Sequence, residues 1–241
     1  MSKARSTAWT RSVTSCSLEL LPSLPALDAG LGAIDIVTLA EAARSLGSSW
    51  SSVLLDARVR AQLRDEIRRV QLDVGTTTLF VTHDQEEALA MADRVGVMSA
   101  GRLQQLATPV ELYNRPRTAF VAEFVGLTNR LAGVVDNAET TVLGTRLPLL
   151  EGSATSGDAT VFVRPESVQV TPRDDGNGRV LSVSFLGSLC RIHTRLADGA
   201  EVLAQVSNTE GANLAAGTPV QVSIRPTPVL ATSGRKPDNI N

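Results

Sequence analysis

One histidine stands at a place in the chain where phosphate chemistry is feasible. His83 follows the apolar run of residues 76–81 and lies within residues 82–87, which carry helix-capping side chains and lead into a helix. A side chain at such a turn lies at the carboxyl edge of a sheet, where open α/β sheets bind ligands, and helix-start amides favour anions. On position alone, a histidine there is more often an ordinary loop residue than a functional one. His83 is therefore a candidate, and its setting has to be derived from its neighbours.

The elements around His83 follow the order strand, helix, strand. Residues 76–81 are β-branched and apolar, which favours a strand buried on both faces, and residues 94–98 favour a second strand. The helix between them has two candidate capping pairs, Thr82 with Gln85 and Asp84 with Glu87. Another helix is predicted upstream, with Gly75 as its end and a core-facing stripe formed by Val59, Leu63, Ile67 and Val70. Together these patterns predict an α/β layer with a parallel sheet.

The first fifth of the chain has a different character. Residues 1–54 show little periodic order, apart from the capping-box spacing of Thr38 and Glu41, which predicts a helix that Gly47 ends. The segment carries no recognisable chemistry.

After Gly126 the periodicity changes from helical to alternating. Residues 190–196 place apolar and polar side chains on opposite faces, and Asp198 and Gly199 form a hairpin signal before the return strand. Residues 220–224 alternate in the same way. Short strands at turn-marked intervals predict a small β-barrel or sandwich.

A set of polar side chains in this β-rich region could form a ligand-binding face. The set is Arg164, Glu166, Arg191, His193 and Arg195. A solvated strand face is the favoured alternative, because charged residues of this kind are usually exposed.

Composition excludes several classes of function. The net charge is −2 and aromatic residues make up 3% of the 241 residues, which argues against nucleic-acid binding. Two cysteines and two histidines share no ligand spacing, so we expect neither a metal site nor a disulfide, and a reducing cytosolic setting. No apolar run approaches the roughly 18 residues of a membrane span.

A long collinear stretch resembles a known family. Residues 55–60 read Leu-Asp-Ala-Arg-Val-Arg, and residues 82–94 read Thr-His-Asp-Gln-Glu-Glu-Ala-Leu-Ala-Met-Ala-Asp-Arg. With residues 101–105, 108–113 and 120–126, they resemble the C-terminal part of the nucleotide-binding domain of ATP-binding-cassette (ABC) import ATPases. The resemblance implies that His83 is the switch histidine, which contacts the terminal phosphate of ATP. It also implies that Asp56 couples the two nucleotide sites across a dimer interface.

The β-rich region carries a second resemblance. Residues 162–168 and 185–188, the Asp198-Gly199 hairpin and Pro226 resemble the accessory TOBE domain that follows these ATPases, which is related to the oligonucleotide-binding (OB) barrel. The resemblance divides the chain into an atypical segment (1–54), the end of an ATPase domain (55–126) and a TOBE/OB-like domain (127–241). It implies ATP and Mg²⁺ as cofactors, and as partners a transmembrane permease, a second ATPase subunit and, indirectly, a solute-binding protein. The expected location is cytoplasmic, peripheral on the inner face of the cell membrane.

Departures from the family pattern limit the activity expected of this chain. The phosphate-binding loop G-x-x-x-x-G-K-[ST] does not occur, since the two lysines are Lys3 and Lys236. The family's signature and its catalytic carboxylate are also missing. We interpret the chain as a truncated or frame-altered ATP-binding subunit of an importer that couples ATP hydrolysis to solute uptake. The alternatives are a non-catalytic regulatory or assembly subunit and an inactive remnant. We further expect the strand over residues 76–81 to expose an apolar edge, and the chain to be poorly soluble alone.

Overall fold

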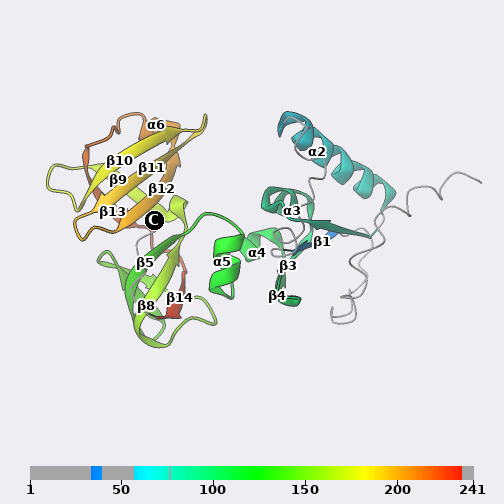
Figure 1. Cartoon of the computed structure of the whole chain (residues 1–241), viewed down its shortest axis with the longest axis horizontal. Coiled ribbons are helices and arrows are strands. Elements are labelled where there is room, and N and C mark those ends of the chain that lie inside the picture. The colour runs from blue at the N-terminus through cyan, green and yellow to red at the C-terminus, as the bar shows by residue number, and fades with distance from the viewer. Residues whose placement is uncertain (1–33, 40–56, 76, 235–241) are drawn as a thin grey trace, which may run out of the picture.

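The computed structural model describes residues 34–39, 57–75 and 77–234. These residues form an α/β layer and a β-domain, with two short helices between them (Figure 1). The described chain is mostly β-sheet with few helices, as the sequence predicts for its second half.

The α/β layer is built on a four-stranded sheet in the order β2-β1-β3-β4. Its strands are β1 (Ile34–Leu39), β2 (Thr78–Thr82), β3 (Arg94–Ser99) and β4 (Arg102–Ala107). β1 is parallel to both β2 and β3, whereas β4 returns antiparallel to β3. The predicted parallel arrangement is therefore present, and β2 forms one edge of the sheet.

The strand β1 was not expected from the sequence. The predicted helix at Thr38 is wrong at its start, because Thr38 and Leu39 are the last residues of β1. The remainder of that helix lies outside the described residues. β-Branched residues dominate the strand, and its position between β2 and β3 gives its backbone ladder partners on both sides.

The first helix forms as predicted, but its apolar stripe is not a core face. α2 (Ala57–Val74) exposes Leu63 by 49%, Ile67 by 39% and Val70 by 48%. Its tie to the layer is polar, because Arg68 donates hydrogen bonds of 2.6 and 2.9 Å to the carboxylate of Asp93. Helical spacing identified the stripe correctly, but a stripe is buried only where a partner covers it.

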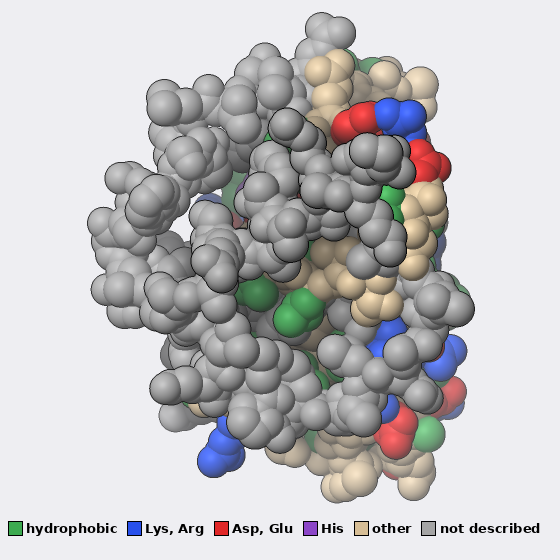
Figure 2. Space-filling model, turned by 90° about the vertical axis from the view of Figure 1, so that its right-hand side faces the viewer, with side chains coloured by type: hydrophobic (Ala, Val, Ile, Leu, Met, Phe, Trp, Pro, Cys, Tyr) green, Lys and Arg blue, Asp and Glu red, His purple; other side chains and the backbone are tan. Residues whose placement is uncertain are grey.

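The expected burial of the edge strand on both faces is also wrong. In β2, Leu79 is 44% and Val81 41% exposed, which confirms the expectation of an apolar sheet edge. Figure 2 looks onto this end of the molecule and shows hydrophobic side chains at its surface beside acidic and basic ones.

Three short helices complete the layer and lead out of it. They are α3 (Gln85–Met91), α4 (Pro109–Asn114) and α5 (Ala119–Phe124). Thr108 and Thr118 cap α4 and α5, and Thr108 forms a reciprocal capping box with Glu111. One apolar cluster joins these helices to β3 through Met91, Val97, Leu112, Val121 and Val125. The layer therefore has a core, and the exposed stripe residues of α2 do not belong to it.

The β-domain consists of two five-stranded antiparallel sheets. The first has the order β12 (Glu201–Ser207), β11 (Leu189–Leu196), β10 (Gly178–Phe185), β13 (Pro219–Ile224) and β9 (Val168–Pro172). The second has the order β14 (Leu230–Ser233), β8 (Ser156–Val163), β5 (Asn129–Asp136), β6 (Glu139–Val142) and β7 (Thr145–Pro148). Two short helical elements accompany them, η3 (Pro165–Ser167) and α6 (Asn208–Gly211).

Both sheets contribute to one core. Val161 of β8, Ile192 of β11 and Val220 of β13 are each fully buried in the same cluster. The alternation predicted for residues 190–196 is confirmed, with His193 on the exposed face. The hairpin at Asp198-Gly199 is confirmed as well, because Gly199 has a φ of 86° and its amide donates a hydrogen bond to the Leu196 carbonyl. A residue with a side chain would be strained at that φ.

Asn129 ties the two sheets together. Its side-chain oxygen accepts a 2.7 Å hydrogen bond from the Leu203 amide, and its Nδ2 donates to the carbonyls of Leu203 and Val163. Asn129 lies at the start of β5 and Leu203 in β12. The buried side-chain amide of Asn129 therefore pairs with the backbone of a strand in the other sheet. Among the helices of the described ranges, none combines the length and hydropathy needed to cross a bilayer.

Candidate functional site

His83 lies in the turn between β2 and α3, where the sequence predicts it. Its side chain is exposed, and the turn is held by its neighbours. The Thr82 hydroxyl donates to a Glu87 carboxylate oxygen at 2.7 Å and accepts from the Asp84 amide at 3.0 Å. These two bonds hold the turn, and the exposed side chain of His83 lies at the carboxyl end of β2, where it is accessible to a ligand or partner.

The helix start beside His83 does not offer its amides to an anion. Asp84 is the N-cap of α3. Of the two predicted capping pairs, the one formed by Asp84 with Glu87 therefore names the correct capping residue. Oδ1 of Asp84 accepts hydrogen bonds from the amides of Glu86 at 2.8 Å and Glu87 at 3.2 Å. The expectation that these amides favour a phosphate is therefore wrong, because a carboxylate of the chain already bonds them.

The described residues do not fit a complete site for ATP and Mg²⁺. A polyphosphate needs a cradle of free amides and a lysine, and both lysines of the chain, Lys3 and Lys236, lie outside the described residues. Within the described ranges, no group of three or more His, Cys, Asp or Glu side chains could hold a metal ion. His83 could contribute one contact to a nucleotide that other groups hold.

Asp56, the second predicted site residue, lies outside the described residues, which begin again at Ala57.

A second constellation, which the sequence did not single out as a unit, lies where the α/β layer meets the β-domain. Its centre is Arg164, which lies between β8 and η3. The backbone of Arg164 is extended, because the following Pro165 disfavours a helical conformation there. The guanidinium Nη1 donates to the carbonyls of Ala122, Gly126 and Leu127 at 2.8, 3.1 and 3.1 Å. Nη2 donates to the Tyr113 carbonyl at 3.0 Å. One side chain of the β-domain thus bonds carbonyls of α4, of α5 and of the linker.

Tyr113 completes this junction. The Arg164 guanidinium carbon lies 4.1 Å from the centre of the Tyr113 ring, a cation–π distance, and the Tyr113 hydroxyl donates to Glu166 at 2.8 Å. Burial, reinforced by this bond to the Glu166 carboxylate, raises the pKa of Tyr113 to about 12. Burial also lowers the pKa of Arg164, although the charge of a guanidinium persists at neutral pH.

The close approach of the linker to Tyr113 requires a glycine. A Cβ at Gly126 would lie 2.8 Å from Tyr113 Cε2 and 3.5 Å from Arg164 Nη1. Nearby, a small apolar cluster of Ala122, Phe162 and Leu230 joins α5 to two strands of the second sheet. The junction is therefore packed as well as hydrogen-bonded.

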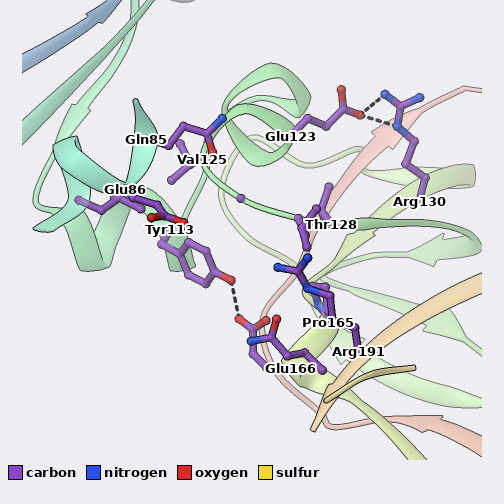
Figure 3. A pocket seen from close by; sticks show the side chains of 14 residues that line it. Gln85, Glu86, Tyr113, Glu123, Val125, Thr128, Arg130, Pro165, Glu166 and Arg191 are labelled. Atoms are coloured by element: carbon purple, nitrogen blue, oxygen red, sulfur yellow. Dashed lines mark hydrogen bonds and ion pairs between the residues drawn. The ribbon is translucent and has the colours of Figure 1, made fainter. Parts of the chain in front are cut away.

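An open groove of about 650 Å³ lies beside the junction (Figure 3). Gln85 and Glu86 of α3 line one wall, and Glu166, Arg191 and Gln205 of the β-domain line the other. Glu123 and Arg130 form an ion pair at its rim. The groove is therefore lined by both α3 and the β-domain, and its α3 residues follow His83 closely in the sequence.

The predicted polar face divides into three parts. Arg164 and Glu166 belong to the junction, Arg191 lines the groove, and His193 is exposed on the outer side of β11. Arg195 is exposed and paired with Glu201 at 2.7 Å. The favoured alternative of a solvated face holds for His193 and Arg195 and is wrong for Arg164. Alternation along one strand could not reveal contacts to carbonyls about forty to fifty residues away.

Comparison with known proteins finds relatives of a large part of the chain and one domain family within it. A family model described as the TOBE domain matches residues 161–231. Sulfate/thiosulfate import ATP-binding protein CysA 2 of Chromobacterium violaceum is 45% identical over 166 residues, covering 64% of this chain and 45% of that protein. Spermidine/putrescine import ATP-binding protein PotA of Mesorhizobium japonicum is 37% identical over 167 residues, covering 66% and 46%. sn-Glycerol-3-phosphate import ATP-binding protein UgpC of Brucella abortus is 34% identical over 192 residues, covering 76% and 52%.

The chain spans about half the length of the curated relatives that it matches. Among solved structures, the cytoplasmic molybdate-binding protein ModG with molybdate bound aligns at a TM-score of 0.36 and 19% identity, covering 43% of this chain and 94% of that one. Similarity at that level does not define a shared fold. The resemblance to import ATP-binding subunits with a TOBE domain is confirmed by the sequence relatives and the family model.

Proposed function

We propose that this chain works in an ABC importer as the C-terminal part of an ATP-binding subunit, because its curated relatives are import ATP-binding proteins and a TOBE-domain model matches residues 161–231. The activity of the assembled importer is ATP hydrolysis coupled to solute uptake. The carrying observation is the 45% identity over 166 residues to an import ATP-binding protein. The names of the relatives differ in their solutes, so the proposal leaves the solute open.

In this proposal His83 serves the nucleotide and the β-domain serves assembly. The exposed imidazole at the end of β2 supports the first role, because it is free to meet a terminal phosphate bound by groups outside the described residues. The Arg164 junction supports the second role, since it holds the β-domain against the helices that follow the sheet. Asp56 would couple two nucleotide sites in a dimer of ATPase subunits.

The partners and location follow from the same proposal. The chain would bind a transmembrane permease and a second ATPase subunit on the cytoplasmic face of the cell membrane, with a solute-binding protein acting indirectly. ATP and Mg²⁺ would be the cofactors of the assembly. Since the described residues do not fit a complete nucleotide site, we expect no ATP hydrolysis by the isolated chain.

Phosphate release tests this division of labour. The chain is assayed with MgATP alone, then after mixing with its permease and a complete ATP-binding subunit from the same organism. We expect no release from the chain alone, and release from the mixture that falls about tenfold or more with His83→Ala, as loss of a transition-state contact predicts. His193→Ala is the matched control, because His193 is exposed on the far side of β11. Equal activity of the mixture with and without the chain would contradict the proposal.

A second candidate function is a non-catalytic regulatory or assembly subunit. The Asp84 carboxylate on the α3 amides favours it, because that helix start cannot also bind a phosphate. In this case the chain would change the ATPase rate of the mixture, and His83→Ala would change it no further. The same assay therefore separates the two candidates.

The origin of residues 1–54 is a separate proposal. An altered reading frame would explain why the family resemblance starts at Leu55. Translating the upstream nucleotides in three frames tests it, and finding neither a phosphate-binding loop nor the family signature in any frame would reject it.

A further inference from the structure

Arg191 differs from the neighbouring arginines of the β-domain. Arg195, two residues beyond it on β11, pairs with Glu201, and Arg179 on β10 donates to the Gly217 carbonyl at 2.6 Å. The Nε of Arg191 is buried and has no hydrogen-bond partner among the described residues. A buried donor without a partner is costly, and native proteins contain few of them. Nε of Arg191 therefore makes no hydrogen bond to the described part of the chain, and the terminal nitrogens of the guanidinium are the ones open to an added acceptor.

The Arg191 side chain borders a space large enough for a ligand. Arg191 lines the groove of about 650 Å³, and Figure 3 shows its side chain directed into that groove on the side of Thr128. Sites for small molecules typically measure roughly 300 to 1,000 Å³. The Gln205 side chain lines the same wall, one strand away and in register with Arg191. An acceptor in the groove could therefore meet both.

The charges of the groove restrict what that acceptor is. Its lining contains Arg130 and Arg191, against Glu86, Glu123 and Glu166. Arg130 is paired with Glu123, which leaves Arg191 facing a groove that also holds the carboxylates of Glu86 and Glu166. Glu166 accepts one hydrogen bond, from Tyr113, through Oε1. Such a lining repels a polyanion and favours a molecule that brings one negative charge and a donor.

We propose that the groove between α3 and the β-domain binds a small organic molecule with one carboxylate and one ammonium group. The planar guanidinium of Arg191 holds the carboxylate, because its fork matches two carboxylate oxygens. Glu86 and Glu166 face the ammonium group. This site is distinct from the nucleotide role proposed for His83 and does not depend on it.

The single tyrosine of the chain provides a local probe. Tyr113 lines the groove, so incorporation of 3-fluorotyrosine gives one ¹⁹F resonance at the site. The full chain is titrated at constant ionic strength with 5-aminovalerate, acetate or sulfate. We expect a saturable shift with 5-aminovalerate, binding of acetate about tenfold weaker through loss of the ammonium contact, and the weakest response with sulfate.

Variants assign the response to Arg191. Arg191→Gln should abolish the saturable shift, and Arg191→Lys should retain a weakened one, because lysine keeps the charge and loses the fork. Arg195→Gln is the matched control on the same strand and should bind as the parent chain does. Circular dichroism melting confirms that each variant is folded. Absence of a saturable shift with 5-aminovalerate, or its persistence in folded Arg191→Gln, would overturn the proposal.

Discussion

The two halves of the molecule differ in how fully they bury the apolar side chains of their periodic patterns. In the β-domain, Val161, Ile192 and Val220 are fully buried between two sheets that share one core. In the α/β layer, the stripe of α2 and the outward residues of edge strand β2 remain about 40 to 50% exposed, as Ile67 and Val81 illustrate. Both regions carry regular periodic patterns, so pattern strength does not account for the difference.

The contrast shows that the two regions differ in how much of their patterned apolar surface their own residues cover. Folding is driven mainly by apolar area removed from water, and the β-domain buries the inward residues of its strands in its own core, while Phe185 of β10 and Leu186 after it stay 70% and 50% exposed. The α/β layer closes one core around Val97 and Leu112 and leaves a second apolar surface open. Open surfaces of this kind mark interaction sites or aggregation sites. We therefore expect the chain alone to have low solubility.

The largest expected effect compares a buried isoleucine with an exposed one. Ile192→Ala should destabilise the β-domain by about 3 to 4 kcal/mol, because it removes a fully buried side chain and leaves a cavity. Ile67→Ala in α2 should change the free energy of unfolding by less than about 1 kcal/mol, since that side chain is 39% exposed. Urea unfolding followed by circular dichroism measures both. Equal losses would remove the contrast between the halves.

The next effect concerns the junction that joins the halves. Arg164→Ala should cost about 2 to 3 kcal/mol, because four backbone carbonyls lose a charged donor. The halves should then separate, with faster proteolysis at the linker over residues 126–128 and a surviving β-domain fragment. Arg173→Ala is the control, as Arg173 is exposed and bonds Asp175. A linker cleaved no faster than in the parent chain would mean that the packing of Ala122, Phe162 and Leu230 suffices to hold it.

A smaller effect is expected within the β-domain itself. Asn129→Ala should destabilise it by about 1 to 2 kcal/mol, since the amide and carbonyl of Leu203 lose their side-chain partner. Asn114→Ala, at an exposed position, should be neutral. Amide hydrogen exchange at Leu203 gives the local readout, and unchanged protection there would show that the sheets are held by apolar packing alone.

The smallest effect is a pH dependence at the junction. The folded-state pKa of Tyr113 is raised to about 12 from an ordinary value near 10, so its contribution to stability is complete below pH 10 and falls as pH rises through 12. The melting temperature of the parent chain should fall more steeply over this interval than that of Tyr113→Phe, which cannot ionise. Identical pH profiles would indicate that Tyr113 ionises freely in the folded state.

Much of the fold was predictable because it depends on local patterns. Alternation from Cys190 to Leu196 defined which side chains of β11 are buried, and helical spacing defined α2. The turn at Asp198-Gly199 and the cap at Asp84 follow from backbone conformations that few residue types favour. His83 was placed correctly between strand and helix by the same local signals.

The candidate site was less predictable, because its contacts join distant parts of the chain. Arg164 and Tyr113 are separated by 51 positions, and no periodicity connects them. At the start of α3, the Asp84 carboxylate occupies an amide that was expected to favour an anion. Asp84 itself was visible in the sequence as a possible helix cap. The strand β1 (Ile34–Leu39) was not predicted, because the strands that pair with it, β2 and β3, lie far along the chain.

The sequence by itself determined helix α2, the strand, helix and strand around His83, where the β-domain hairpin turns, and which family the chain resembles, because each rests on residues close together in the chain. Tertiary structure alone decided whether an apolar stripe is covered, which carbonyls Arg164 bonds, and that Arg191 faces a groove without a partner. Burial and hydrogen-bond satisfaction are properties of surfaces that meet in space. A side chain acquires them only when the rest of the fold, or another molecule, is placed against it.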